Sequence, residues 1–356
     1  MRDLRNIEMV EMEPSIATNV LCGDNGQGKT SILEAIYLVA TTRSFRTHRL
    51  REVIRHGVSA GSVRATLADP LGTRQQLVGL ASGKRRVRID EQKPQSTASY
   101  AIKTPVVVFH PGELRLTMGP ASGRRTLIDR VALFDDATSH DSLRAYTRAM
   151  RARQRLLQRH GVQAPGVEAY EQLMVRSGIQ VTHQRQRAVA KLIGATCEAF
   201  RQIAPRTMRL EARYAPGGSE DEAEAVERLF ELREADSRRA GAHFGPHRDD
   251  LVFELNGRKV RTDASQGQHR LLILSLKIAE MACIGAASGT NPLLLLDDVS
   301  SELDSTRTEA FFALLGLRRD QVFLTTTRPE MLPIFERQMG RVKLFRVRSG
   351  CVERDN

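Results

Sequence analysis

The sequence contains no tryptophan, and aromatic residues make up only 5% of its 356 residues. The few Phe and Tyr residues do not alternate with the runs of Lys and Arg in the sequence. Stacking on single-stranded bases is therefore less expected than contact with a duplex backbone. The four cysteines are scattered and form no CxxC pair: Cys22, Cys197, Cys283 and Cys351. This pattern gives no support to a zinc site and indicates free thiols in a reducing compartment.

Long apolar runs are also missing. No run approaches the roughly 18 apolar residues that a membrane helix needs. The longest obvious one, residues 292–296, is followed by carboxylates, and the charged start, Met1 to Glu13, is unlike a signal peptide. Hydrophobic residues make up 41% of the chain and charged residues 27%, a soluble globular composition. We expect a cytoplasmic protein without a membrane partner, forming one large domain or two modest ones.

Positive charge is in excess and unevenly distributed. The chain has 54 Lys and Arg against 42 Asp and Glu, a formal net charge of +12. Residues 138–215 contain 14 basic and 5 acidic side chains, whereas residues 219–236 contain 2 and 8. A concentrated basic stretch is typical of proteins that bind the phosphate backbone of nucleic acid, although a solvated helical face would look similar.

Arginines that could contact double-stranded DNA fall into two groups. The first group follows a helix predicted at about residues 30 to 40 and comprises Arg43, Arg46 and Arg49. The second group lies on one face of a helix predicted within residues 138–215 and comprises Arg144, Arg148 and Arg151. A further basic cluster occupies residues 84–88. Solvated surface is an equally good interpretation of the clusters at 43–55 and 84–88.

Hydrophobic periodicity predicts mixed α and β structure in the first part of the chain. A strand at 18–22 leads into a glycine-rich loop, and a helix follows from about 30 to 40. Three short β-type runs separated by turn residues predict an antiparallel meander, and another apolar strand follows; these segments are 62–68, 75–81, 86–89 and 105–109.

The middle of the chain reads as helical and the last third returns to α/β. Periodicity and glycine stops predict a helix ending near Gly161 and a long helix over 167–203. Asn256-Gly257 predicts a hairpin between strands at 251–255 and 259–262. A helix at 268–287 and strands at 292–297, 322–326 and 341–348 follow.

The predicted fold class is α/β: one α/β core split in sequence, with a helical lobe inserted between its halves. The expected division is an N-terminal core part at 1–130, a basic helical lobe at 131–242 and a C-terminal core part at 243–356.

The glycine-rich loop carries the most specific motif of the chain. Residues 23–30 fit the full GxxxxGK[ST] pattern between a strand and a helix, the context of a nucleotide-binding phosphate loop. Its backbone N–H groups and the helix N-terminus would surround the phosphates of ATP. Lys29 would reach the β- and γ-phosphates, and Thr30 would bind Mg²⁺. The expected contacts to ATP are Gly23, Asp24, Asn25, Gly26, Gln27, Gly28, Lys29, Thr30 and Ser31.

A second nucleotide element is the apolar strand 293–296, which is followed by two carboxylates. Such charges lie at the carboxyl edge of a sheet, where α/β proteins place ligands. We expect Asp297 to hold Mg²⁺ directly or through water, and Asp298 to orient or deprotonate the attacking water. This pair of motifs alone would still permit many motor, kinase and GTPase families.

Two flanking motifs narrow the choice. Residues 300–304 resemble the D-loop of ABC-type ATPases, and residues 265–268, just before a helix, resemble the core of their signature motif. In ABC-type proteins the signature motif serves the nucleotide bound to the opposite protomer. The resemblance implies a homodimer with ATP and a monomer without it. The residues contributed in trans would be Ser265, Gln266, Gly267, Gln268 and Asp304. The alternative for Ser265 is a plain helix N-cap.

The order of further motifs resembles one family along nearly the whole chain. The phosphate loop continues into Leu33-Glu34-Ala35-Ile36-Tyr37 and Arg43-Ser44-Phe45-Arg46. Later segments are 111–116, 119–120, 124–125, Asp129, Gly245-Pro246-His247-Arg248-Asp249-Asp250-Leu251, 265–268 and 297–304. In this order they resemble the RecF family of bacterial gap-repair proteins. One departure is His110, which stands where small residues are common, near a Q-loop position that shows no clear glutamine.

The resemblance implies an ABC-type ATPase head with a second helical lobe. It implies dimerisation on DNA with ATP and slow hydrolysis coupled to release. It also implies action at junctions of single- and double-stranded DNA with RecR and RecO, upstream of RecA, and a link to replication restart and the SOS response.

Two other functional classes stay open at this point. An ATPase subunit of a transporter would need a membrane partner, which the basic insertion and Asp298 argue against. A structural DNA-binding dimer with vestigial hydrolysis is the other. His243 and His247 have the spacing of helix-borne metal ligands, but Gly245-Pro246 breaks a helix between them. A structural or nucleotide-sensing loop is the favoured interpretation of this segment.

Overall fold

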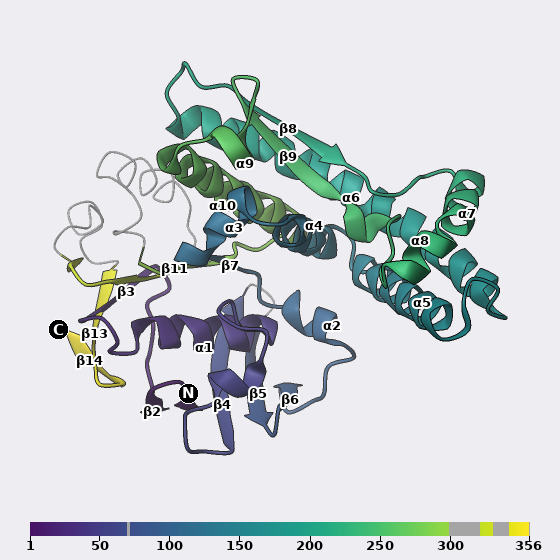
Figure 1. The fold of residues 1–356 in the computed structure, drawn as a ribbon. Coiled ribbons are helices and arrows are strands. Elements are labelled where there is room, and N and C mark those ends of the chain that lie inside the picture. The colour runs from purple at the N-terminus through teal and green to yellow at the C-terminus, as the bar shows by residue number, and fades with distance from the viewer. Residues whose placement is uncertain (70–71, 299–320, 330–341, 356) are drawn as a thin grey trace. The chain divides into compact units, whose positions relative to one another are not determined.

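The computed structural model describes residues 1–69, 72–298, 321–329 and 342–355, and the chain divides into two compact units (Figure 1). The first unit comprises residues 1–113 and 284–356, and the second comprises residues 114–283. The sequence-based division expected core parts at 1–130 and 243–356, and the compact units have other boundaries. Residues 243–283 belong with the second unit because their apolar side chains complete its hydrophobic core.

The first unit contains a six-stranded sheet. Its strand order is β14 (Cys351–Asp355), β13 (Val342–Arg348), β3 (Thr18–Cys22), β12 (Val322–Thr326), β11 (Leu293–Leu296) and β7 (Val106–Phe109). All neighbouring pairs are parallel except the β13–β14 hairpin. The carboxyl ends of β3, β12 and β11 therefore meet at one edge, and that edge carries the candidate site.

A second, five-stranded sheet also belongs to the first unit. Its order is β2 (Ile7–Met9), β1 (Arg2–Leu4), β4 (Ala60–Asp69), β5 (Gly72–Ala81) and β6 (Lys84–Ile89). Strands β4, β5 and β6 pair antiparallel in sequence order, which is the predicted meander. The short elements of this unit are η1 (Leu50–Val53), α2 (Thr97–Ala101) and η2 (Pro111–Leu114), the last reaching the boundary between the units.

Helix α1 (Lys29–Thr41) packs against both sheets of the first unit. Ile32 and Leu33 join the core of the six-stranded sheet, whereas Leu38 and Val39 join that of the five-stranded sheet. Burial on two sides explains why even Glu34, a charged residue in the middle of the helix, has no exposed surface. The helix that follows the phosphate loop is thereby held firmly in place.

The second unit is not purely helical, in contrast to the prediction from the sequence. Its helical elements are α3 (Arg115–Met118), α4 (Ala121–Asp135), α5 (Ser139–His160), α6 (Val167–Ile203), α7 (Glu222–Glu231), α8 (Arg233–Arg238), η3 (Pro246–Arg248), α9 (Val260–Asp263) and α10 (Gln266–Ser288), the last extending past the unit boundary. It also contains an antiparallel sheet of β8 (Leu210–Ala215), β9 (Asp250–Leu255) and β10 (Arg258–Lys259). Helix α6 runs without interruption.

The predicted hairpin in the second unit is present but shorter. Asn256 and Gly257 both have positive φ angles, 51° and 75°, as a type I′ turn requires. The returning strand β10 covers only two residues, and the chain then enters α9 instead of continuing as a strand.

Helix α10 is long and apolar enough to cross a membrane by length and composition alone. More than half of this apolar stretch is buried, and Leu271, Leu272 and Leu276 pack with α4, α6 and β9 in the core of the second unit. It is therefore a core helix, a feature that counting uninterrupted apolar runs does not reveal.

Candidate phosphate-loop site

The phosphate loop connects β3 to α1, as predicted. Gly23, Gly26 and Gly28 all have positive φ angles, and Gly28 is the N-cap residue of α1. A Cβ atom at Gly23 would lie 2.3 Å from the Val347 carbonyl oxygen, so close passage of β13 requires glycine there. The Lys29 ammonium donates to the carbonyl oxygens of Gly23 and Asp24, at 2.5 and 2.8 Å.

Lys29 places a positive charge at the start of α1, close to three carboxylates. Burial lowers the pKa of the Lys29 ammonium, and the nearby carboxylates of Asp298, Asp24 and Asp297 oppose this shift. Its charge lies beside the N-terminus of α1, whose unpaired N–H groups also carry partial positive charge. This geometry provides a cradle for phosphate groups.

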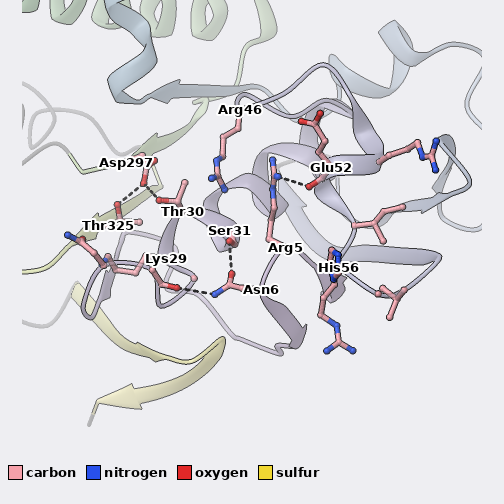
Figure 2. A pocket seen from close by; sticks show the side chains of 18 of the residues that line it. Arg5, Asn6, Lys29, Thr30, Ser31, Arg46, Glu52, His56, Asp297 and Thr325 are labelled. Atoms are coloured by element: carbon pink, nitrogen blue, oxygen red, sulfur yellow. Dashed lines mark hydrogen bonds between the residues drawn. The ribbon is translucent and has the colours of Figure 1, made fainter.

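Two polar side chains support the loop: Asn6, which lies outside the motif and is labelled in Figure 2, and Gln27, which lies within the motif. Asn6 donates through Nδ2 to the Gly26 carbonyl at 3.2 Å and accepts from the Ser31 hydroxyl at 2.9 Å. The Gln27 side chain accepts from the backbone N–H of Ser349, in the β13–β14 turn, at 2.5 Å. Ser31, expected to contact the nucleotide, thus has its hydroxyl directed to Asn6.

Asp297 lies directly after β11 and meets α1 and β12. Its Oδ1 accepts hydrogen bonds from the Thr30 hydroxyl at 2.8 Å and from the Thr325 hydroxyl at 2.9 Å. Its backbone N–H donates to the Phe109 carbonyl at the end of β7, at 2.8 Å. Burial raises the pKa of this carboxyl, while the hydrogen bonds from Thr30 and Thr325 and the nearby His110 oppose the shift.

Asp298 follows in an uncommon backbone conformation, with φ at 55°. Its N–H donates to the Thr325 hydroxyl at 2.9 Å. The structure therefore brings the predicted residues Lys29, Thr30, Asp297 and Asp298 to one edge of the six-stranded sheet. Thr325, which the sequence did not single out, lies among them on the intervening strand.

A cavity of about 890 Å³ opens beside the phosphate loop. Near the loop it is lined by Asn25, Gly26, Lys29 and Thr30, and by both carboxylates of the 297–298 pair. Its remaining wall comes from the segment around η1 and the turn between β5 and β6, including Arg46, Arg51, Ile54, His56, Val58 and Gly83. The cavity is larger than a site for phosphate groups alone would need to be.

One buried carboxylate, that of Glu34, holds two of the arginines that line this cavity. Glu34 accepts two hydrogen bonds from Arg5, both at 2.7 Å, and one from the Ser44 hydroxyl at 2.5 Å. Arg46 also approaches it, at 3.3 Å. Arg46, which the sequence groups with candidate DNA-binding arginines, therefore lies at the cavity and beside a carboxylate. Arg43 and Arg49 are exposed.

The signature-like segment forms a capping box at the start of α10. The Gln268 backbone N–H donates to the Ser265 hydroxyl at 3.3 Å, and the Ser265 N–H donates to the Gln268 side chain at 2.7 Å. Ser265 therefore caps α10 within the second unit, as the alternative interpretation expected. A role of this segment toward a nucleotide in trans stays a prediction. Asp304 and the rest of the predicted D-loop lie outside the described residues.

The predicted basic face of α5 is present. Arg144, Arg148 and Arg151 are exposed, whereas Arg153 on the opposite face is fully buried and paired with Glu171 and Asp236. Arg185, on α6, is likewise buried against Asp129 and Asp249. Part of the positive charge of residues 138–215 is therefore neutralised internally, but the α5 stripe faces solvent.

His243 and His247 have separate partners in the second unit. His243 contacts Asp236 through Nδ1 at 2.6 Å, and His247 contacts the Tyr146 hydroxyl through Nδ1 at 2.6 Å. Within the described ranges, no group of three potential metal-binding side chains occurs. These contacts support the structural interpretation of the loop.

Comparison with known proteins defines the class. Residues 1–351 match the sequence profile of the RecF/RecN/SMC N-terminal domain. With a phosphate loop and a carboxylate pair at one sheet edge, this makes the first unit an ATPase head of the ABC and SMC type. The DNA replication and repair protein RecF of Anaeromyxobacter sp. (strain Fw109-5) is 41% identical, covering 92% of this chain and 90% of the relative. The chain belongs to the RecF family.

Further relatives agree. RecF of Myxococcus xanthus (strain DK1622) is 35% identical, covering 91% of this chain and 88% of its own length. A solved structure of the recombination mediator protein RecF-ATP in the RecFOR pathway matches with a TM-score of 0.88 and 25% identity, covering 99% and 95% of the two chains. An Smc head domain from Pyrococcus furiosus, at 14% identity and TM-score 0.56 over 99% and 94%, shares the fold. The family resemblance seen in the sequence is confirmed.

Proposed function

We propose that this chain is an ATP-dependent DNA clamp of recombinational gap repair and replication maintenance, which binds ATP at the phosphate loop of its first unit. The observation that carries the proposal is the meeting of Lys29, Thr30 and Asp297 at one sheet edge, beside a cavity of about 890 Å³. The loop would hold the phosphates. The wall that contains Ile54, His56 and Val58 would leave room for the nucleoside.

Thr30 and Asp297 would hold Mg²⁺. Both present oxygen atoms, the donors that Mg²⁺ prefers, and their side chains are 2.8 Å apart. Magnesium, when bound, would neutralise charge on the β- and γ-phosphates. The neighbouring carboxylate of Asp298 would orient or deprotonate the attacking water, and the Lys29 ammonium would stabilise charge on the transferred phosphoryl group. Hydrolysis would be weak, DNA-dependent and used as a switch.

Assembly and partners are proposed by analogy with the family. The proposed clamp dimerises on double-stranded DNA when ATP is bound and is a monomer without it, with Ser265 to Gln268 and Asp304 completing the partner's site. It would act at single/double-strand junctions with RecR and RecO, upstream of RecA, and contribute to replication restart and the SOS response. Support comes from the relatives' description as replication and repair proteins and from the RecFOR pathway named for the matching structure. A cytoplasmic location stays a prediction from the sequence.

Nucleotide binding can be tested at Lys29. Titration of a fluorescent ATP analogue should show saturable binding to the wild-type chain, and Lys29→Met should weaken it at least 30-fold because a charged hydrogen bond to phosphate is lost. Arg49→Met is the matched control, since this exposed side chain lies outside the cavity lining. Equal affinities for the wild type and Lys29→Met would refute a phosphate-loop nucleotide site.

Asp298→Asn separates a clamp from a structural DNA-binding dimer with vestigial hydrolysis. In a clamp, the variant should stay assembled on DNA with ATP and fail to release. Wild-type DNA dissociation in the variant would show that hydrolysis does not gate release, which would favour the structural dimer.

A further inference from the structure

Strand β12 carries a residue that contacts both acidic residues of the site, the carboxylate of Asp297 and the backbone of Asp298. Thr325 is 2% exposed and lies on the strand between β3, which enters the phosphate loop, and β11, which ends at Asp297. Its hydroxyl donates to Asp297 Oδ1 at 2.9 Å and accepts the Asp298 N–H at 2.9 Å. Figure 2 shows the Thr325, Asp297 and Thr30 side chains together. A single buried hydroxyl thus uses one donor and one acceptor on neighbouring acidic residues.

The backbone at Asp298 shows what this contact accomplishes. With φ at 55°, Asp298 adopts the left-handed conformation that L-residues disfavour, and the hydrogen bond to Thr325 ties its N–H to β12. Asp297, the preceding residue, is anchored to the strand on the other side of β11, because its backbone N–H donates to the Phe109 carbonyl on β7. The chain is therefore turned sharply between the carboxylates, and their relative direction depends on both anchors.

We propose that Thr325 is a positioning residue for ATP hydrolysis: its hydroxyl fixes the Asp298 backbone and one oxygen of Asp297. The inference rests on the proposed function, because Asp298 is there the group that acts on the attacking water. Thr30 also donates to the same Asp297 oxygen, so Asp297 keeps that anchor when Thr325 is changed. The Asp298 N–H, by contrast, donates to the Thr325 hydroxyl itself. Loss of this hydroxyl should therefore impair turnover much more than nucleotide binding.

The residue type at 325 fits this role. A buried central strand favours β-branched side chains, and threonine is the β-branched residue with a hydroxyl. Valine has nearly the same shape without the polar group, so Thr325→Val removes the two hydrogen bonds and little else. Serine restores the hydroxyl without the methyl group. The two variants separate packing from hydrogen bonding.

The test compares Thr325→Val, Thr325→Ser and Thr325→Ala in the full chain. We expect Thr325→Val to bind the fluorescent ATP analogue within about threefold of wild type while its DNA-stimulated kcat falls at least 30-fold, because misplacing a reacting group by an ångström costs about a hundredfold. Thr325→Ser should recover at least a third of the wild-type kcat. Thr325→Val combined with Asp298→Asn should lower kcat less than threefold below Asp298→Asn alone, because both changes remove the same contribution.

The outcomes that overturn the inference are distinct from failure of the proposed function. A wild-type kcat in Thr325→Val, an equal loss in the valine and serine variants, or a binding loss as large as the turnover loss would each reject positioning. If the valine variant does not fold, the serine and alanine variants decide, since only serine should retain turnover. A wild-type chain that neither binds nor hydrolyses ATP would instead reject the proposed function itself.

Discussion

The Glu34 carboxylate and the Arg5 guanidinium form a two-point ion pair inside the first unit, with both N–O distances at 2.7 Å. Arg46 approaches the same carboxylate at 3.3 Å, and both arginines line the cavity beside the phosphate loop. One buried negative charge therefore holds two positive side chains at the candidate nucleotide site.

Glu34→Gln should destabilise the first unit by about 3 kcal/mol, near the lower end of the range for breaking a buried ion pair because Arg5 is partly exposed. Denaturant unfolding followed by circular dichroism would measure this loss. Glu52→Gln is the matched control: this half-exposed carboxylate pairs weakly with Arg49, and the change should cost less than about 1 kcal/mol. Similar losses in the two variants would contradict the assignment of Glu34 as the organising charge.

Gly23→Ala should lower affinity for the ATP analogue at least tenfold. The added Cβ would collide with the Val347 carbonyl oxygen, and backbone on β13 or in the phosphate loop would have to move. Gly194→Ala serves as the control, because a Cβ at this position in α6 meets no atom within 4 Å. It should stabilise the chain by about 0.5–1 kcal/mol, as expected for alanine in place of glycine in a helix. Unchanged ATP-analogue affinity in Gly23→Ala would show that close passage of β13 does not constrain the loop.

Stability should fall in mild acid because of His247. Burial lowers the pKa of its imidazole, aided by Arg248 and Arg125, although hydrogen bonding to the Ala242 carbonyl opposes the shift. The unfolded chain, with histidine near its ordinary pKa of about 6.5, then binds more protons than the folded chain. Unfolding free energy should therefore be highest above about pH 6.5 and decrease by up to about 1.4 kcal/mol per pH unit below it, until the folded-state pKa is reached.

His247→Gln should flatten this dependence, as measured by urea unfolding between pH 5 and pH 8 at constant ionic strength. Some slope should persist, because burial also lowers the pKa of His269. His160→Gln, at an exposed position at the end of α5, should leave the wild-type profile intact. If the unfolding free energy of His247→Gln kept the full wild-type dependence on pH, that dependence would come from groups other than His247.

The arginine stripe on α5 should contribute to DNA affinity. Replacing Arg144, Arg148 and Arg151 together with glutamine should weaken binding to a duplex and reduce the slope of log affinity against log salt by roughly 2–3, about 0.9 for each phosphate that is no longer neutralised. Fluorescence anisotropy with labelled duplex at several salt concentrations would measure both effects. The same changes at Arg228, Arg238 and Arg239, which are exposed within or just after the acidic residues 219–236, alter net charge equally. If the two triple variants weakened duplex binding equally, the loss would reflect net charge and not a specific contribution of the α5 stripe.

The sequence predicted those parts of the site that depend on local spacing. The phosphate loop and the strand before Asp297 are continuous segments with specific patterns, and both lie where they were expected. The roles of Thr325, Asn6 and Glu34 could not be predicted because their contacts arise from strand order and packing. Thr325 reaches Asp297 only because β12 lies beside β11, and nothing in its neighbouring residues indicates that pairing.

The division into units was harder to predict for a related reason. The apolar pattern of α10 fits either a core of the ATPase head or a core of the inserted lobe, and only tertiary contacts with α4, α6 and β9 decide between them. Strand β8, at residues 210–215, was missed because its alternation is short and follows a long helix. Charge counting likewise included Arg153 and Arg185, which the fold buries against carboxylates.

In the proposed function, ATP gates assembly on DNA. Sedimentation velocity of the full chain tests it most directly, with no nucleotide, with ADP, and with ATP and Mg²⁺, each in the presence and absence of duplex DNA. We expect a monomer without nucleotide or with ADP, a dimer with ATP that is favoured further by DNA, and no ATP-dependent dimer for Lys29→Met. A sedimentation coefficient that does not change with ATP, or a Lys29→Met dimer like that of the wild type, would contradict it.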